Sequence, residues 1–342
     1  MTNLKDDLRK DTNMNTDVKL SIVILCWNDR KVIQDCLRSI YVGTRSVGFE
    51  IIVSDNGSTD GSLEMIRKEF PDVRVVENGA NLGFAKGNNA GIRLSAGEYV
   101  LVLNPDTIVE NGALDRWVAF ADCHPEAGAF GCRVLNPDGS FQNPARPFPT
   151  IWRTWVAALY LRPLAHVSNL FLADVYTGWA GTSEREIDWQ SGCCVMFRAD
   201  VLHRLNGFDE QFFYTKEEVD LCFRVHKAGY SILYTPEPAV IHLGGQSVGR
   251  FPIRFAIEEY RSAYRYFYKH YGAAATCQLK TASMVKLRVR QLGYGLLNLL
   301  RSSDVLRRRL DMYKACTDWN GSLDPLRFVE RGEEPTLQSN TV

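Results

Sequence analysis

Short runs of almost uninterrupted apolar residues constrain the fold more than any other feature of this sequence. Three of them cover residues 20–26 (LSIVILC), 49–54 (FEIIVS) and 98–103 (EYVLVL). Such runs are typical of strands buried on both faces of a parallel sheet. A shorter strand is expected at 73–77. Helices must therefore cover both faces of this sheet.

Helical periodicity fills the segments between these strands. Helices are expected over 29–41, 60–70 and 84–95. Alternating strands and helices predict a doubly wound α/β domain with a mostly parallel sheet, whose ligand lies on loops at the carboxyl ends of the strands. These loops begin with Trp27 and Asn28, with Asp55, Asn56 and Gly57, and with Asn104, Pro105 and Asp106.

After residue 110 the pattern loosens. We expect a strand at 128–135, a proline-rich loop at 136–150, a helical insertion over the site at 151–173 and a helix at 217–228. The sequence from 253 onward is helical in pattern. The expected organisation is a disordered tail over 1–19, an α/β domain over 20–252, a helical region over 253–330 and a disordered tail over 331–342.

Charge and cysteine content exclude several classes of protein. The 342 residues include 40 basic and 40 acidic side chains, so bulk charge does not indicate a nucleic-acid partner. The nine cysteines contain no C-x-x-C pair, which argues against a disulfide framework or a structural zinc site and suits the cytoplasm. The polar start resembles no signal peptide, and no apolar stretch is long enough for a membrane span.

Two polar loops have a nucleotide-binding interpretation and a structural one. In SDNGSTDGS (54–62), Asp55 either accepts hydrogen bonds from a nucleotide base or belongs to a turn in which Ser58 or Asp60 caps the next helix. In NLGFAKGNNAGI (81–92), small residues allow the backbone to approach a ligand, and Lys86 is placed to meet a phosphate.

Acidic residues and one histidine form a second group of candidates. Asp106 follows a buried strand and is suited to hold a divalent ion against two phosphates, although it also suits a plain turn. Glu217, Glu218 and Asp220 crowd one helix start, where acids are also favoured by the helix dipole alone. His242 ends an apolar strand, a position in which a lone histidine is usually structural.

The motifs CWN, SDNGSTDGS, NLGFAKGNNAGI, LNPDT, DWQSGCCVMFR, GFDEQFFYTKEEVDLCFR and IHLGG occur in an order that resembles family-2 glycosyltransferases of the GT-A fold. The chain is most similar to the bacterial rhamnosyltransferase-like branch, which builds O-antigen and other cell-surface polysaccharides. The resemblance covers residues 20–250. It implies a GT-A-type α/β domain followed by a helical extension, with a nucleotide diphosphate sugar as donor and a glycan or lipid-linked saccharide as acceptor.

The resemblance also implies a role for each matching residue. The nucleotide-sugar positions are Cys26, Trp27, Asn28, Asp55, Asn81, Gly83, Lys86, Asn88, Asn104 and Asp106. Asp106 and His242 match metal-binding positions, for Mg²⁺ or Mn²⁺. Glu218 matches the second acid of the family's E-D motif, the general base, with Glu217 and Asp220 as neighbouring candidates. Trp189, Ser191 and Gly192 match the sugar and acceptor pocket.

Two departures from the family pattern bear on activity. Asn104 replaces the first acid of the D-x-D motif, which leaves fewer charges for the metal, and Glu218 is one methylene longer than the usual Asp. The implied reaction inverts the anomeric carbon, with dTDP-rhamnose as the expected donor. An inactive homologue that serves as a nucleotide-sugar-binding or scaffold protein is the alternative. A dinucleotide-dependent oxidoreductase is disfavoured, because residues 26–32 contain no glycine.

A basic and leucine-rich segment, residues 280–310, predicts a further partner. It contains eight basic residues and the single acid Asp304, interleaved with apolar side chains. This composition suits either a helix with a solvated basic face or an amphipathic helix on an anionic membrane. The expected location is therefore cytoplasmic, peripheral on the inner face of the membrane.

Overall fold

The structure, a computed structural model, describes residues 18–171, 176, 179–244, 252–301 and 303–335. The expected tails at 1–19 and 331–342 lie mostly outside the described residues. The chain divides into two compact units. The first unit comprises residues 1–147, 178–213 and 217–244, and the second comprises 148–177, 214–216 and 245–342.

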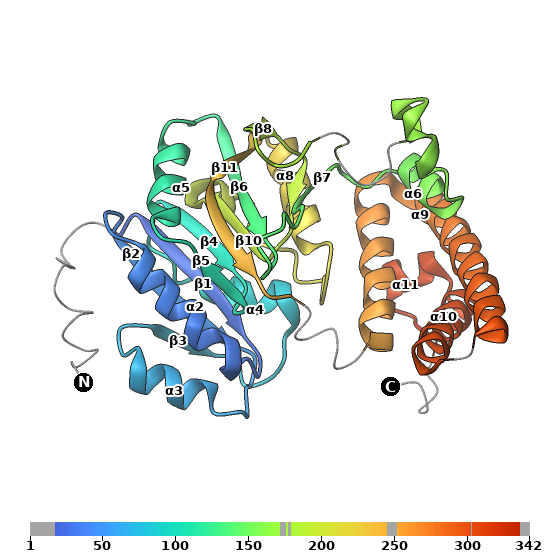
Figure 1. Cartoon of the computed structure of the whole chain (residues 1–342), viewed down its shortest axis with the longest axis horizontal. Helices are drawn as coiled ribbons and strands as arrows, with labels where there is room; N and C mark the ends of the chain where they lie inside the picture. Colours follow the sequence, from blue (N-terminus) through green and yellow to red (C-terminus); the bar gives the residue numbers. More distant parts are fainter. Residues whose placement is uncertain (1–17, 172–175, 177–178, 245–251, 302, 336–342) are drawn as a thin grey trace. The chain divides into compact units, whose positions relative to one another are not determined.

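The first unit is built on one mixed sheet (Figure 1). Its strands are β1 (Leu20–Cys26), β2 (Phe49–Asp55), β3 (Arg74–Glu77), β4 (Tyr99–Leu103), β5 (Thr107–Val109), β6 (Ala127–Leu135), β8 (Arg185–Glu186), β10 (Cys194–Arg198) and β11 (Ser231–His242). The order is β3-β2-β1-β4-β10-β6-β11-β5, with β8 paired to β11. Strands β1 to β4 run parallel, whereas β10 is antiparallel to both β4 and β6.

Six helices of this unit lie among the described residues. They are α2 (Arg30–Gly43), α3 (Ser62–Glu69), α4 (Gly83–Ile92), α5 (Ala113–Asp122), α7 (Ala199–Arg204) and α8 (Glu217–Lys227). The predicted strands and helices of residues 20–103 are all present, with ends shifted by at most a few residues. The doubly wound, mostly parallel α/β fold is confirmed.

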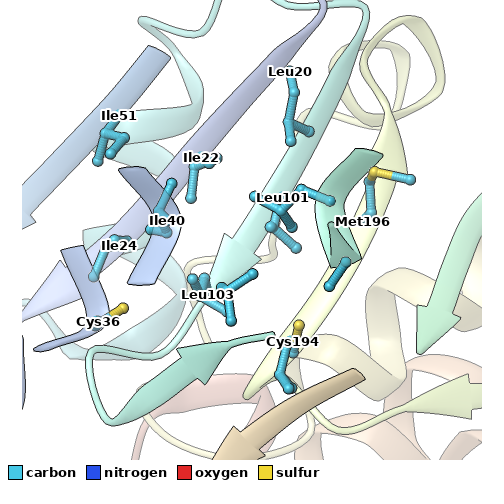
Figure 2. Close-up of a cluster of buried hydrophobic side chains, with 14 of the residues drawn as sticks. Leu20, Ile22, Ile24, Cys36, Ile40, Ile51, Leu101, Leu103, Cys194 and Met196 are labelled. Carbon is cyan, nitrogen blue, oxygen red and sulfur yellow. The ribbon is translucent and has the colours of Figure 1, made fainter. Parts of the chain in front are cut away.

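Alternation along β1 explains why the sheet needs helices on both faces. Leu20, Ile22 and Ile24 point to one face and are fully buried. Figure 2 shows them in the same core as Cys36 and Ile40, which come from α2. Because the strand buries its residues on both faces, hydrophobic burial fixes its central position in the sheet.

The opposite face of β1 carries α4, and the glycines of that helix set how closely it packs. A Cβ atom at Gly87 would lie 2.4 Å from Leu25 Cδ1, and one at Gly91 would lie 2.6 Å from Val23 Cγ1. The small residues of the 81–92 loop therefore serve helix–sheet packing. Our interpretation of them as a place where backbone approaches a ligand is wrong for these two glycines, because strand side chains already fill that space.

A two-stranded sheet interrupts the region that the sequence predicts to be loop. β7 (Ala145–Arg146) pairs antiparallel with β9 (Trp189–Gln190). β7 is only two residues long and lies between prolines, so no strand pattern marks it in the sequence. The proline-rich stretch 136–150 is thus not entirely irregular.

The second unit is helical (Figure 1). It contains α6 (Ile151–Ala158), two short 3-10 helices (Arg162–His166 and Asn169–Phe171), α9 (Pro252–Leu300), α10 (Asp304–Ser322) and α11 (Pro325–Arg331). Helices α6, α10 and α11 all contact α9. Gly272 (φ 79°, ψ −176°) divides α9 into two limbs, a conformation that glycine adopts easily. The helical pattern predicted from 253 onward is confirmed.

Candidate active site

The sheet order places the polar loops at one edge of the first unit. β1 lies between β2 and β4, so successive connections leave it in opposite directions. Ligands of open α/β sheets bind outside the carboxyl ends of the strands at such a switch point. The loops after Cys26, Asp55 and Leu103 all begin there.

The first two loops are tied together by Asn28. Its side-chain Oδ1 accepts a hydrogen bond from the backbone N–H of Thr59 (2.7 Å), and its own N–H donates to Ser58 Oγ (2.9 Å). Asn28 has a φ of 58°, a left-handed conformation that Asn tolerates better than most residues. The structure therefore gives Asn28 a scaffolding role at this edge.

Asp55 stabilises a turn through one carboxylate oxygen, and its other oxygen has no hydrogen-bond partner among the described residues. Its Oδ2 accepts from the backbone N–H groups of Gly57 and Ser58, both at 2.9 Å. Its Oδ1 is buried and has no hydrogen-bond partner among the described residues. A buried carboxylate oxygen without a donor is costly, so a ligand N–H is a fitting partner.

Cys26 does not expose its side chain to a ligand. It is fully buried in the core beneath the loops, and burial raises the pKa of its thiol to about 12. Its carbonyl oxygen accepts from the backbone N–H of Asn56 (2.8 Å). Cys26 thus supports the loops after β1 and β2 from below, while Trp27 is partly exposed at the start of the first loop.

The structural interpretation of this loop, in which Ser58 or Asp60 caps the next helix, holds only in part. The residue before α3 is Gly61, which makes no side-chain cap. Asp60 Oδ1 accepts from the backbone N–H of Ser62 (3.1 Å), and its Oδ2 accepts from that of Arg30 (2.9 Å). Asp60 thereby joins the starts of α2 and α3. Ser58 contacts the first loop instead of capping a helix.

Gly83 is required by close packing against Phe213. Its φ is 81°, and a Cβ atom there would lie 2.5 Å from the carbonyl oxygen of Phe213. The backbone N–H of Phe84 donates to that same oxygen (2.8 Å). Asn81 Oδ1 accepts from the N–H of Gly83 (3.0 Å), so Asn81 organises this turn.

Asn88 and Lys86 remain suited to a ligand. Asn88 is fully buried and donates to the carbonyl of Phe84 (2.9 Å), but its Oδ1 has no partner among the described residues. Lys86 is exposed on the first turn of α4. Its charge is therefore free to meet an anion that enters this edge.

Asp106 and His242 lie together although 136 positions separate them in the sequence. Strands β5 and β11 pair antiparallel with Thr107 opposite His242. This register brings His242 Nε2 to 3.3 Å from Asp106 Oδ1. Asp106 is largely buried, at 7% exposure. The prediction that the fold brings these two residues together is confirmed.

Gln142, which the sequence analysis did not single out, orients the histidine. Its Oε1 lies 2.8 Å from His242 Nδ1, while its Nε2 donates to Asn136 Oδ1 (2.8 Å). The second bond fixes the amide orientation, so His242 Nδ1 must be the donor. In the neutral ring, Nε2 then presents its lone pair toward Asp106.

His242 Nε2 and Asp106 Oδ1, 3.3 Å apart, are close enough to be two ligands of one cation, and the same distance fits an ion pair when the ring is protonated. Among the described residues, no group of three or more His, Cys, Asp and Glu side chains is placed to hold a metal. A two-residue protein site suits Mg²⁺ or Mn²⁺, which take further ligands from substrate phosphates and water. Asn104 is beside this pair, where its carbonyl accepts from Thr107 Oγ1 (2.6 Å).

The acidic pair Glu217 and Glu218 begins α8 directly after two strained residues. Thr215 and Lys216 have φ values of 62° and 68°. Positive φ at a β-branched residue is rare and clusters at functional sites. Glu217 is 4% exposed, whereas Glu218 is partly exposed.

Asp220 belongs to a buried ion pair. Its Oδ2 accepts from Arg224 Nε at 2.7 Å, and Asp220 is fully buried. Arg224 also donates to the carbonyls of Leu205 and Gly207, both at 2.8 Å. This network joins α8 to the end of α7, which favours a structural role over our catalytic candidacy for Asp220.

Asp106, of the candidate metal pair, and Glu218 both lie within electrostatic range of Cys193. Burial raises the pKa of its thiol to about 12, and the negative charges of Asp106 and Glu218 act in the same direction. The preceding residue, Gly192, has its Cα so close to Glu218 that an added Cβ would lie 3.7 Å from Glu218 Cβ. The predicted base thus lies beside the predicted sugar pocket.

The other pocket residues differ in accessibility. Trp189 is 9% exposed, and its Nε1 donates to the carbonyl of Pro147 (3.0 Å). Ser191 is partly exposed, and its backbone N–H donates to the carbonyl of Pro144 (2.9 Å). Trp189 therefore mainly anchors the strand before the pocket, and Ser191 and Gly192 are better placed to line it.

The fold of the first unit is of the GT-A type. The chain has a fold similar to a solved mannosyltransferase of Pyrobaculum calidifontis in complex with GDP-Man and Mn²⁺. The TM-score is 0.54 at 16% identity, over 96% of this chain and 93% of the other.

Sequence comparison narrows this class. The family model for glycosyl transferase family 2 matches residues 21–204. An N-acetylglucosaminyl-diphospho-decaprenol L-rhamnosyltransferase of Mycobacterium tuberculosis is 32% identical over 260 residues, which cover 73% of this chain and 83% of that protein. Rhamnosyltransferase WbbL of Escherichia coli is 25% identical over 57% of this chain and 72% of its own. The chain belongs to glycosyl transferase family 2, in its rhamnosyltransferase-like branch, and is a glycosyltransferase.

Proposed function

We propose that this chain is an inverting, metal-dependent glycosyltransferase that moves rhamnose from dTDP-rhamnose to an acceptor hydroxyl. The observation that carries this proposal is the approach of His242 Nε2 to Asp106 Oδ1, with Glu218 in the same neighbourhood. Two elements of such a reaction, a cation site and a carboxylate base, then lie at the switch point of the sheet.

Asp106 and His242 would hold Mg²⁺ or Mn²⁺ between the protein and the donor diphosphate. When bound, the cation supplies Lewis-acid stabilisation of the departing nucleoside diphosphate. Gln142 keeps His242 in the tautomer that directs Nε2 toward this position. Because Asn104 contributes an amide where related sites have a carboxylate, the diphosphate itself must provide more of the negative charge.

Glu218 acts as the general base. It accepts the proton of the acceptor hydroxyl while that oxygen attacks the anomeric carbon from the side opposite the diphosphate, which inverts the configuration. A positioned base contributes about 10²–10⁴-fold to such a step. The buried Glu217 stays a neighbouring candidate, since both acids occupy the first turn of α8.

The donor nucleotide binds across the first two loops. Asp55 Oδ1 accepts a hydrogen bond from the base, which compensates an otherwise unpaired buried oxygen. Lys86 meets the diphosphate, and Trp27 contacts the base or ribose. Ser191 and Gly192 border the sugar.

The acceptor is a glycan or a lipid-linked saccharide in the synthesis of a cell-surface polysaccharide. The mycobacterial relative is named for rhamnosyl transfer to N-acetylglucosaminyl-diphospho-decaprenol, and a Myxococcus xanthus relative is named for O-antigen biosynthesis. Both names support, for this chain, a glycan or lipid-linked acceptor.

Donor binding is tested by a thermal-shift panel of nucleotide sugars, with and without Mn²⁺. At concentrations well above Kd, dTDP-rhamnose with Mn²⁺ should raise Tm by several degrees, because a ligand that binds only the folded state stabilises it. UDP- and GDP-sugars provide the comparison. A panel in which no nucleotide sugar raises Tm would contradict the proposal, and binding without any transfer would favour the inactive homologue.

A further inference from the structure

Exposed apolar side chains gather in the helical unit. Among the described residues, sixteen large hydrophobic side chains are exposed, and all except Val42 and Leu243 belong to that unit. Thirteen of them fall in two segments: Trp152, Leu159, Tyr160, Leu164, Val167 and Leu170, and then Val289, Leu292, Leu296, Leu297, Leu299, Leu300 and Val305. Such concentration marks an interaction surface.

The two segments adjoin within this unit. Helix α6 packs against α9, and Arg290 Nε donates to the hydroxyl of Tyr160 (3.2 Å). The same guanidinium donates through Nη1 to the hydroxyl of Tyr313 on α10 (3.2 Å). Arg290 therefore connects both segments and α10, and we name residues 152–170 and 289–309 together the apolar–basic region.

Charge in this region is almost entirely positive. Residues 148–172 and 280–303 contain no Asp or Glu. Five basic side chains of the region are exposed, namely Arg162, Arg301, Arg307, Arg308 and Arg309, and the exposed Arg288 directly precedes it. The acid at the start of α10, Asp304, is itself exposed and lies 3.9 Å from Arg307.

Some of the basic and apolar residues at 280–310 that suit a membrane surface instead make contacts within the protein. Leu287 is 1% exposed and belongs to the core, and Lys280 donates to the carbonyl of Leu323. Tyr294 packs on Tyr313 with ring centroids 5.3 Å apart. In contrast, Leu299 is 85% exposed and Leu300 77%. The exposed leucines thus cluster at the α9–α10 turn.

We propose that the apolar–basic region binds the surface of an anionic lipid bilayer. The exposed leucines would enter the acyl boundary while the arginines contact lipid phosphates, a combination that suits an interface and not a span. Consistently, no helix among the described residues is long and apolar enough to cross a membrane. A second copy of the chain is a poorer occupant, because pairing this region with itself would oppose arginines with arginines.

Flotation of the full-length chain with vesicles tests this inference. Vesicles of phosphatidylcholine alone are compared with vesicles that also contain phosphatidylglycerol, at low and high salt. We expect binding to the anionic vesicles that weakens as salt screens the charges. The triple variants Leu296→Ser/Leu299→Ser/Leu300→Ser and Arg307→Gln/Arg308→Gln/Arg309→Gln should each lower the affinity about tenfold or more.

Matched controls are available in the α/β unit. Val42→Ser removes an apolar side chain that is 68% exposed, and Arg45→Gln/Arg67→Gln/Arg93→Gln removes three exposed charges. Both should bind vesicles like the native chain. Equal binding to neutral and anionic vesicles, or equal losses in test and control variants, would overturn the inference. The inference would also be overturned if the chain bound none of the vesicles and instead formed a dimer that the leucine variant abolishes. Donor binding, measured in parallel, is independent of each result.

Discussion

His242 illustrates how one side chain gains a function from two neighbours. Gln142 Oε1 accepts a hydrogen bond from His242 Nδ1, and Asp106 Oδ1 lies beside Nε2. One ring nitrogen is therefore held by the protein, and the other lies at the candidate metal position. Asp106 and His242 were predicted because they match the family's metal-binding positions, and both lie at strand ends that the fold brings together. Gln142 was missed because its loop returns to the site from 100 residues away, a contact that no local pattern indicates.

Replacing Asp106 tests the metal assignment. In Asp106→Ala the carboxylate that faces His242 is absent, so Mn²⁺-dependent binding of dTDP should disappear while the fold persists. Isothermal titration of dTDP with and without Mn²⁺ measures the effect. Unchanged Mn²⁺-dependent binding in this variant would show that the cation, if any, binds elsewhere.

Replacing Gln142 tests the orientation of His242. Gln142→Leu removes the acceptor of the Nδ1 proton, and loss of such a supporting bond typically lowers metal affinity about 10–100-fold. Gln142→Glu keeps an acceptor and should retain most of the affinity. Titration of Mn²⁺ into the dTDP-bound chain gives the comparison. Equal affinity in the leucine and glutamate variants would assign Gln142 no part in positioning.

Among the secondary-structure elements, the apolar strands could be predicted from the sequence. The structural roles of some loop glycines could not. Continuous apolar runs identify β1, β2 and β4 because both faces of each strand are covered. A glycine-rich loop, however, has the same sequence whether its glycines face a ligand or a neighbouring strand. Gly83 and Gly87 proved to face Phe213 and Leu25. β7 was missed because two residues carry no periodicity.

Asp220 provides a prediction about how α8 is held. Because Asp220 is buried and paired with Arg224, Asp220→Asn should lower the free energy of unfolding by about 3 kcal/mol, a typical loss for one partner of a buried pair. Turnover per folded molecule should change little. Asp200→Asn is the control, since it breaks an exposed i,i+4 pair with Arg204 and should cost less than about 1 kcal/mol.

Urea denaturation gives both stabilities, and turnover is measured on the folded fraction. Native-like stability of Asp220→Asn combined with lost turnover would return Asp220 to the catalytic candidates. In that case Glu218 would no longer be the preferred base.

For the whole molecule, a formal net charge of zero conceals an uneven distribution. The α/β unit contains the candidate site, whereas the helical unit contains most exposed leucines and a region rich in arginine. The basic segment at 280–310 was visible in the sequence. Its connection to 152–170 was not, because 130 positions separate Tyr160 from Arg290, a distance that no local pattern spans.

The base assignment is the central claim of this account, and sugar transfer by Glu218→Gln tests it most directly. This substitution keeps the shape of the side chain and removes the proton acceptor. Transfer from dTDP-rhamnose should therefore fall by about two orders of magnitude or more, with donor Kd unchanged. Glu217→Gln, on the same helical turn, is the matched control and should lose less. A larger loss of turnover in Glu217→Gln, or native turnover in Glu218→Gln, would contradict the account.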